Sequence, residues 1–146
     1  MFTIENTALI VIDIQEKLFR VMHEKEELAA NNVKLIKGLK ALDIPVIVTE
    51  QNPKGLGPTI PEIVSLLPDM KPLEKFAFSC CMEDSFTETL TELTKQNRYQ
   101  ILITGIETHI CVYQTAMDLK NTNVQIVKDC VSSRTPGNRD SAIRSL

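Results

Sequence analysis

Four short runs of apolar residues, rich in β-branched side chains, divide the chain into regular intervals. They cover residues 8–12 (ALIVI), 46–48 (VIV), 101–103 (ILI) and 124–127 (VQIV). Three of the four are apolar at every position rather than at every second one, which is typical of parallel strands that are covered on both faces. The pattern therefore predicts a buried parallel sheet.

Between these runs, apolar residues recur at helical spacing. Residues 16–42, 85–96 and 107–120 are each expected to form a helix with one apolar face. Because strands and helices alternate, we expect a three-layer, doubly wound α/β/α sandwich with a mostly parallel, Rossmann-like sheet. Glycine and proline are concentrated in residues 52–58, which predicts a loop at the edge of the site. We interpret residues 1–146 as a single domain.

Charge and hydropathy limit the kinds of molecule that this protein is expected to bind. The chain has 146 residues, and 16 basic residues are offset by 19 acidic ones, giving a net charge of −3. No basic face is prepared for nucleic acid, and no apolar run is long enough to span a membrane. No glycine-rich phosphate loop follows a strand, which disfavours a dinucleotide-binding module. We expect a cytoplasmic protein that binds a small molecule and uses no cofactor.

The cysteine content favours free thiols over disulfides or a metal site. The four cysteines are Cys80, Cys81, Cys111 and Cys130. No secretion signal precedes them, and a core of this size needs no cross-links. They form no CxxC pair, and with only His23 and His109 as further ligands a zinc cluster is not expected.

Polar residues that follow the predicted strands are the candidates for chemistry, because ligands of parallel sheets bind at the carboxyl ends of the strands. Asp13 follows the first run, Lys75 lies in a short stretch before the third, and Cys111 follows the third. Alone, each has an ordinary structural interpretation: a turn former, a surface lysine and a core thiol. Cys111 stands out because it lies near a helix start, where the helix dipole is expected to lower the pKa of a thiol.

Three segments resemble the isochorismatase-like cysteine hydrolases. They are residues 8–15 (ALIVIDIQ), Lys75 with the following Phe78 and Ser79, and residues 104–112 (TGIETHICV). Residues 127–135 resemble the next strand and loop of that family. The resemblance implies that Asp13, Lys75 and Cys111 form the catalytic set.

The resemblance also implies how a substrate is held. The bond between Ile106 and Glu107 matches a non-proline cis peptide, which would aim the backbone N–H of Glu107, with that of Cys111, at a developing oxyanion. We expect Phe19 and Gln51 to line the pocket, since both follow strand ends at the same edge. His109 could line the pocket or only stabilise a turn, and the sequence leaves both open.

Departures from the family limit the substrate. The histidines and aspartate that hold a metal in nicotinamidases have no counterpart in residues 49–58, so no metal is expected. Retention of Cys111 favours an amide, ureido or related C–N substrate, hydrolysed through a covalent thioester. The sequence ends before the family's usual last strand and helix, so either it is truncated or this member leaves a sheet edge uncovered. An uncovered sheet edge invites pairing, so we expect a homo-oligomer, a dimer or larger.

A second interpretation belongs to another class of function. Cys80, Cys81 and Cys111 could respond to oxidants, which would make the chain a non-catalytic scaffold or thiol redox sensor on the same fold. Turnover that is lost in Cys111→Ala would favour the enzyme. Thiol reactivity without turnover of any amide would favour the sensor.

Overall fold

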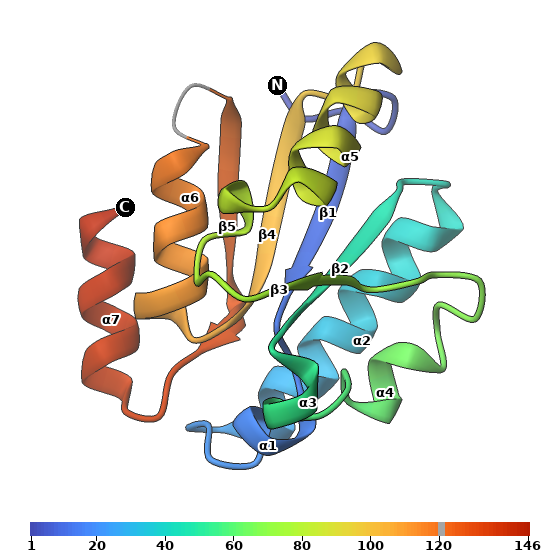
Figure 1. Ribbon diagram of the computed structural model, residues 1–146. Helices are drawn as coiled ribbons and strands as arrows, with labels where there is room; N and C mark the ends of the chain where they lie inside the picture. Colours follow the sequence, from blue (N-terminus) through green and yellow to red (C-terminus); the bar gives the residue numbers. More distant parts are fainter. Residues whose placement is uncertain (120–121) are drawn as a thin grey trace.

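A five-stranded parallel sheet forms the centre of the computed structural model, which describes residues 1–119 and 122–146 (Figure 1). The strand order is β3-β2-β1-β4-β5. The strands are β1 (Thr7–Ile12), β2 (Val46–Gln51), β3 (Leu73–Lys75), β4 (Gln100–Ile106) and β5 (Asn123–Ser132). The predicted doubly wound α/β fold is confirmed. The apolar runs did not reveal β3, because its sequence, Leu-Glu-Lys, contains only one apolar residue.

Helices cover both faces of the sheet (Figure 1). They are α1 (Glu16–Phe19), α2 (Lys25–Ala41), α3 (Pro53–Leu56), α4 (Pro61–Val64), α5 (Asp84–Lys95), α6 (Tyr113–Asp118) and α7 (Pro136–Ser145), with short helical turns η1 (Cys80–Met82) and η2 (Thr108–Val112). One face packs against α1, α2 and α4, and the other against α5, α6 and α7. In the described ranges, no helix is long and apolar enough to cross a membrane.

Strand β1 supplies the core on both sides of the sheet because alternate side chains point to opposite faces. Ile10 and Ile12 join the cluster under α5 and α6, whereas Leu9 and Val11 join the cluster under α2 and α4. All four side chains are fully buried. Burial of a large aliphatic side chain contributes about 1.5–3 kcal/mol, so β1 anchors both layers.

The helix predicted over residues 16–42 is in fact two helices. Between α1 and α2 the backbone of Glu24 takes a left-handed conformation with φ of 51°. The N–H of His23 donates to the carbonyl of Ser133 at 2.9 Å, outside any helical pattern. The break ties this turn to the loop that follows β5, a contact between distant segments that local periodicity does not encode.

Two other boundaries differ from the prediction. The helix expected over residues 107–120 starts with the π-helical turn η2 and continues as α6 to Asp118, while Lys120 lies outside the described residues. The loop predicted over residues 52–58 contains the short helix α3. The last helix, α7, starts at Pro136. The hydroxyl of Thr135 accepts the N–H of Asn138 at 3.2 Å and caps this helix.

The site lies where the connections from neighbouring strands leave in opposite directions. This change of direction falls between β1 and β4, where ligands of doubly wound sheets bind. Gly105, near the end of β4, has φ of +135°, and a Cβ on it would run into the carbonyl of Ile12. Only glycine allows this close approach, which brings the end of β4 beside Asp13.

Candidate functional site

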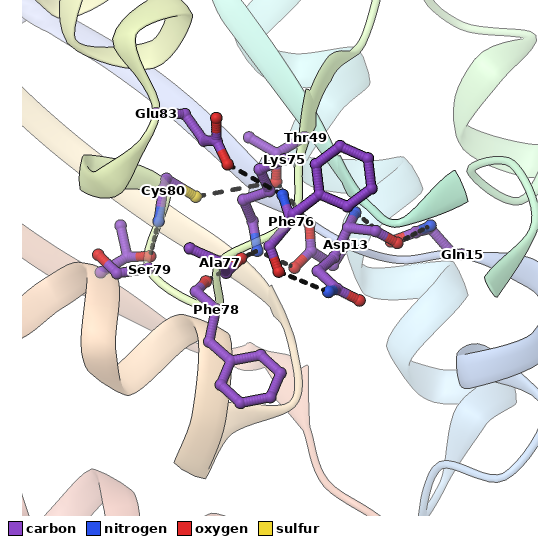
Figure 2. Close-up of polar contacts among 12 residues, drawn as sticks. Asp13, Gln15, Thr49, Lys75, Phe76, Ala77, Phe78, Ser79, Cys80 and Glu83 are labelled. Atoms are coloured by element: carbon purple, nitrogen blue, oxygen red, sulfur yellow. Dashed lines mark hydrogen bonds and ion pairs between the residues drawn. The ribbon is translucent and has the colours of Figure 1, made fainter. Parts of the chain in front are cut away.

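A buried ion pair lies at the carboxyl edge of the sheet (Figure 2). Asp13 follows β1, and its Oδ2 lies 2.7 Å from Nζ of Lys75, the last residue of β3. The two side chains are 0% and 2% exposed. Thr49 of β2, the strand between them, donates its hydroxyl to Oδ1 of Asp13 at 2.8 Å. Three neighbouring strands thus position one carboxylate.

The loop after β3 completes the surroundings of Lys75. Its ammonium donates to the carbonyls of Ala77 at 3.0 Å and Phe78 at 2.8 Å, so Asp13 and these two oxygens occupy its three hydrogens (Figure 2). Burial is the largest single influence and opposes the charge on Lys75, but Asp13, Cys111 and Cys80 together outweigh burial and leave the pKa of Lys75 raised. Lys75 is therefore a permanent cation at neutral pH.

Cys111 lies in the π-helical turn η2 and is 5% exposed. Burial, followed by the negative charge of Asp13, raises the pKa of its thiol, although Lys75 acts in the opposite direction. The expectation that the helix start lowers this pKa is therefore wrong for the ligand-free site. The reason is that Cys111 is enclosed beside a carboxylate. The thiol keeps its proton, and any attack by sulfur needs a base.

A pocket of about 270 Å³ opens over Asp13 and Cys111. Its lining is Asp13, Leu18, Gln51, Leu56, Phe78, Glu107, Ile110, Cys111 and Arg134. Gln51 and Glu107 thus lie on the wall where a substrate would be held, and Lys75 lies behind Asp13 rather than on the wall. Among the residues that the structure describes, Leu18 lines the pocket in place of Phe19. Phe19, one residue further along α1, packs instead against the cluster under α2.

A second acid–cation pair lies on the pocket wall. Glu107 is buried, and its Oε1 accepts the backbone N–H of Arg134 at 3.1 Å, while Oε2 lies 3.5 Å from Nε of Arg134. The Arg134 side chain is 62% exposed. The peptide bond between Ile106 and Glu107 is cis.

His109 contacts the loop after β5. Its Nδ1 and the hydroxyl of Ser133 are 2.9 Å apart.

Sequence reasoning missed several residues of the site, among them Thr49, Leu18 and Arg134. Thr49 was not singled out although it lies at the end of the second apolar run, and Leu18 looked like one more residue of a helix. Arg134 lies in a segment that matched the family pattern but was given no role. The signal that could have found it is its position after β5, since this strand ends at the same edge as β1 and β4.

Acidic, cysteine and histidine side chains do not converge in the way a metal requires. Across residues 1–119 and 122–146, no group of three or more of them is arranged to hold a metal ion. The site described above therefore consists of an ion pair, a thiol and a mixed apolar and polar wall. Such a set can bind a small molecule, accept a proton and form a covalent bond through sulfur.

Fold and site together define an α/β protein of the isochorismatase-like class. The isochorismatase domain family matches residues 7–146. The chain is 35% identical over 144 residues to isochorismatase domain-containing protein 2 of Danio rerio, covering 97% of this chain and 71% of that protein. It is 34% identical to the secreted isochorismatase effector Isc1 of Phytophthora sojae, covering 97% and 69%. The chain belongs to the isochorismatase domain family, which places it among the isochorismatase-family hydrolases.

Solved structures agree with this assignment. The MAR1 ribonuclease structure from Caenorhabditis elegans is 36% identical and superposes with a TM-score of 0.88, covering 98% of this chain and 73% of that one. The YcaC gene product of Escherichia coli, described as an octameric hydrolase of unknown specificity, shares the fold with a TM-score of 0.89 at 22% identity, covering 99% and 72%.

Proposed function

We propose that this protein is a cysteine-dependent hydrolase of a small amide, ureido or related C–N substrate. Cys111 is the nucleophile, Asp13 is the general base and acid, and Lys75 holds the carboxylate. The observation that carries this proposal is the pocket that both Asp13 and Cys111 line, with Lys75 paired to Asp13 at 2.7 Å directly behind it. A carboxylate, an ammonium and a thiol at one enclosed edge of the sheet supply a base and a nucleophile together. An ion pair that only stabilises the fold does not supply both.

The first half of the reaction forms a covalent intermediate. As sulfur of Cys111 attacks the carbonyl carbon, Asp13 accepts the thiol proton, because the raised thiol pKa leaves little thiolate beforehand. The tetrahedral intermediate then collapses, the C–N bond breaks, and Asp13 returns the proton to the leaving amine. The product on Cys111 is a thioester, or an S-carbamoyl ester for a ureido substrate.

The second half restores the enzyme. Asp13 accepts a proton from water while the water oxygen attacks the thioester, and the carbon–sulfur bond breaks to release the acid. The proton on Asp13 returns to sulfur. Lys75 stays charged throughout and keeps Asp13 in place by its 2.7 Å contact. We assign the backbone N–H groups of Glu107 and Cys111 to the developing oxyanion, and Gln51 to the wall that positions the substrate.

Kinetics of two variants test the proposal. Ammonia release from a panel of small amides and ureido compounds identifies a substrate, and Cys111→Ala should then abolish turnover while keeping the fold. Asp13→Asn should lower kcat on the order of 100-fold or more with little change in substrate binding, because an amide cannot take the thiol proton. Normal kcat in either variant would remove that residue from the mechanism. Arg144→Met, on the exposed end of α7, serves as a control.

The redox-sensor interpretation makes the opposite prediction. It needs thiols that oxidants reach, whereas Cys80 is fully buried and Cys111 is 5% exposed. Burial also raises the pKa of Cys80 to about 11, which keeps it in the unreactive thiol form. Both observations disfavour Cys80 as a sensor thiol, and a sensor would have to rely on Cys81, which is partly exposed. Peroxide sensitivity of Cys111 without turnover of any compound in the panel would favour the sensor.

Assembly and location are part of the same proposal. We expect a homo-oligomer, a dimer or larger, because β3 and β5 are sheet edges and much of β5 is exposed. Light scattering on the purified protein tests this, and a monomer at all concentrations would contradict it. We also propose that the protein works in the cytoplasm on a free small molecule and needs neither nucleic acid nor a cofactor. Activity that survives chelators and nuclease supports this proposal.

A further inference from the structure

The two cations at the site, Lys75 behind the pocket and Arg134 on its wall, differ in how accessible their charge is to a ligand. Lys75 is 2% exposed, and its ammonium donates its three hydrogens to Asp13 and two backbone carbonyls. Arg134 lines the pocket and is 62% exposed. A molecule that enters the pocket therefore meets the guanidinium of Arg134 and not the ammonium of Lys75.

Glu107 orients the side chain of Arg134 without occupying all of its hydrogen-bond donors. One carboxylate oxygen accepts the backbone N–H of Arg134, and the other lies 3.5 Å from Nε, too long for a strong charged hydrogen bond. Among the described residues, no acceptor pairs with the two η nitrogens. Glu107 thus fixes the orientation of the guanidinium, and the donors on its outer edge can bind a ligand.

We propose that Arg134 is a specificity-determining residue that binds a carboxylate at the far end of the substrate. This inference rests on the proposed function, because it places the scissile C–N bond at Cys111. The planar fork of an arginine matches both oxygens of a carboxylate, which gives direction as well as affinity. The substrate class becomes short amide acids and ureido acids.

The remaining walls fix the orientation and size of such a molecule. Asp13 lies beside the nucleophile and repels an anion there, so the carboxylate must lie on the Arg134 side. Leu18, Leu56 and Ile110 supply apolar contacts for the short aliphatic segment between the two ends. About 270 Å³ is below the range of drug-sized pockets, which favours a compound with only a few carbons between its functional groups.

Matched pairs of compounds test the carboxylate preference. Succinamic acid is compared with 4-methylpentanamide, and ureidoacetic acid with isobutylurea, because an isopropyl group has the shape of a carboxylate without its charge. The wild-type protein should show the higher kcat/KM for the acid of at least one pair. Arg134→Met should lower that value on the order of 10- to 100-fold, the range expected for charged hydrogen bonds, and should act through KM.

Two further variants separate binding from structure. Arg134→Lys keeps the cation but loses the fork, so it should restore part of the preference. Arg144→Met removes the same charge from the exposed C-terminal end of α7, at a residue outside the pocket lining, and it should leave the preference unchanged. Equal kcat/KM for acid and isostere in the wild type, or an unchanged ratio in Arg134→Met, would overturn the inference while leaving the hydrolase intact.

Calorimetry keeps the two proposals separate. Binding of succinamic acid and ureidoacetic acid to Cys111→Ala, compared with Cys111→Ala/Arg134→Met, needs no turnover. Tighter binding of either acid to the single variant supports the carboxylate site even if the wild type hydrolyses neither compound. Equal binding by both variants refutes it even if hydrolysis is found.

Discussion

Two acid–cation pairs lie within one small site and differ in almost every physical respect. Asp13 and Lys75 are 2.7 Å apart and nearly unexposed, and they are surrounded by hydrogen-bond partners from β2 and the loop after β3. Glu107 and Arg134 approach only to 3.5 Å, and the arginine is 62% exposed. The first pair is part of the packed interior, whereas the second is a buried acid with its cation in solvent.

The difference shows how burial determines what an ion pair can do. In the enclosed pair, each charge depends on the other, because neither can be solvated by water. That dependence fixes the position of Asp13 to the degree that proton transfer needs. In the open pair, water screens the charges and the arginine stays available to a ligand. In our proposals, the enclosed pair therefore serves catalysis and the open pair serves recognition.

Lys75→Met should have the largest effect on stability. It leaves the Asp13 carboxylate buried without its cation, which costs about 3–5 kcal/mol of unfolding free energy. Denaturant titration measures this cost. The double variant Asp13→Asn/Lys75→Met removes both charges and should recover most of the stability, although not the activity. If the single variant were as stable as the wild type, the pair would not be enclosed as described.

Gly105→Ala tests the contact that brings the enclosed pair and Cys111 together. Its Cβ would meet the carbonyl of Ile12, so β4 must shift away from β1. We expect a loss of about 1–3 kcal/mol, the range for overpacked interiors, together with reduced kcat. Gly38→Ala on the exposed side of α2 has open space and should gain about 0.5–1 kcal/mol. Similar changes in the two variants would contradict the close approach.

Alkaline titration sharpens the contrast through the charge on Lys75. Because the folded pKa of Lys75 is raised, its pairing stabilises the protein fully below pH 10.5 and is lost as pH rises through the folded pKa. The unfolding free energy of the wild type should therefore fall more steeply above pH 10.5 than that of Asp13→Asn/Lys75→Met. Parallel pH profiles of the unfolding free energy for the two proteins would show that Asp13 does not stabilise the protonated form of Lys75.

Arg134→Met should have the smallest effect on stability. Exposed ion pairs contribute about 0–1 kcal/mol, and the backbone N–H of residue 134 still donates to Glu107 after the substitution. Denaturant midpoints of this variant and the wild type should nearly coincide. A loss as large as that of Lys75→Met would mean that the two pairs do not differ in the way their burial indicates.

The sequence predicted the layers of the fold better than its boundaries. Apolar runs revealed four strands, three of them without a polar position, as burial on both faces predicts. The run in β5 includes Gln125, which is exposed. The break between α1 and α2 was missed because it depends on a hydrogen bond from His23 to Ser133, more than a hundred residues away along the chain. Local patterns carry no information on such a contact.

The site was only partly predictable for similar reasons. Asp13 follows a strand, which suggested its position, but its left-handed backbone with φ of 53° was not foreseeable from an ordinary aspartate. Lys75 is among the largest fully buried side chains, whereas a lysine in isolation suggests the surface. Its partner is 62 residues earlier in the chain, so the pair was predicted only by combining the strand-end argument with the family resemblance.

The most direct test of the account is to trap the covalent intermediate. The protein is mixed with whichever amide or ureido compound it hydrolyses fastest, quenched in acid during turnover, and analysed by intact and peptide mass spectrometry. The account predicts an acyl or carbamoyl adduct on the peptide that contains Cys111, and no adduct in Cys111→Ala. Turnover by Cys111→Ala at the wild-type rate, or an adduct on Cys80 or Cys81 instead, would contradict it.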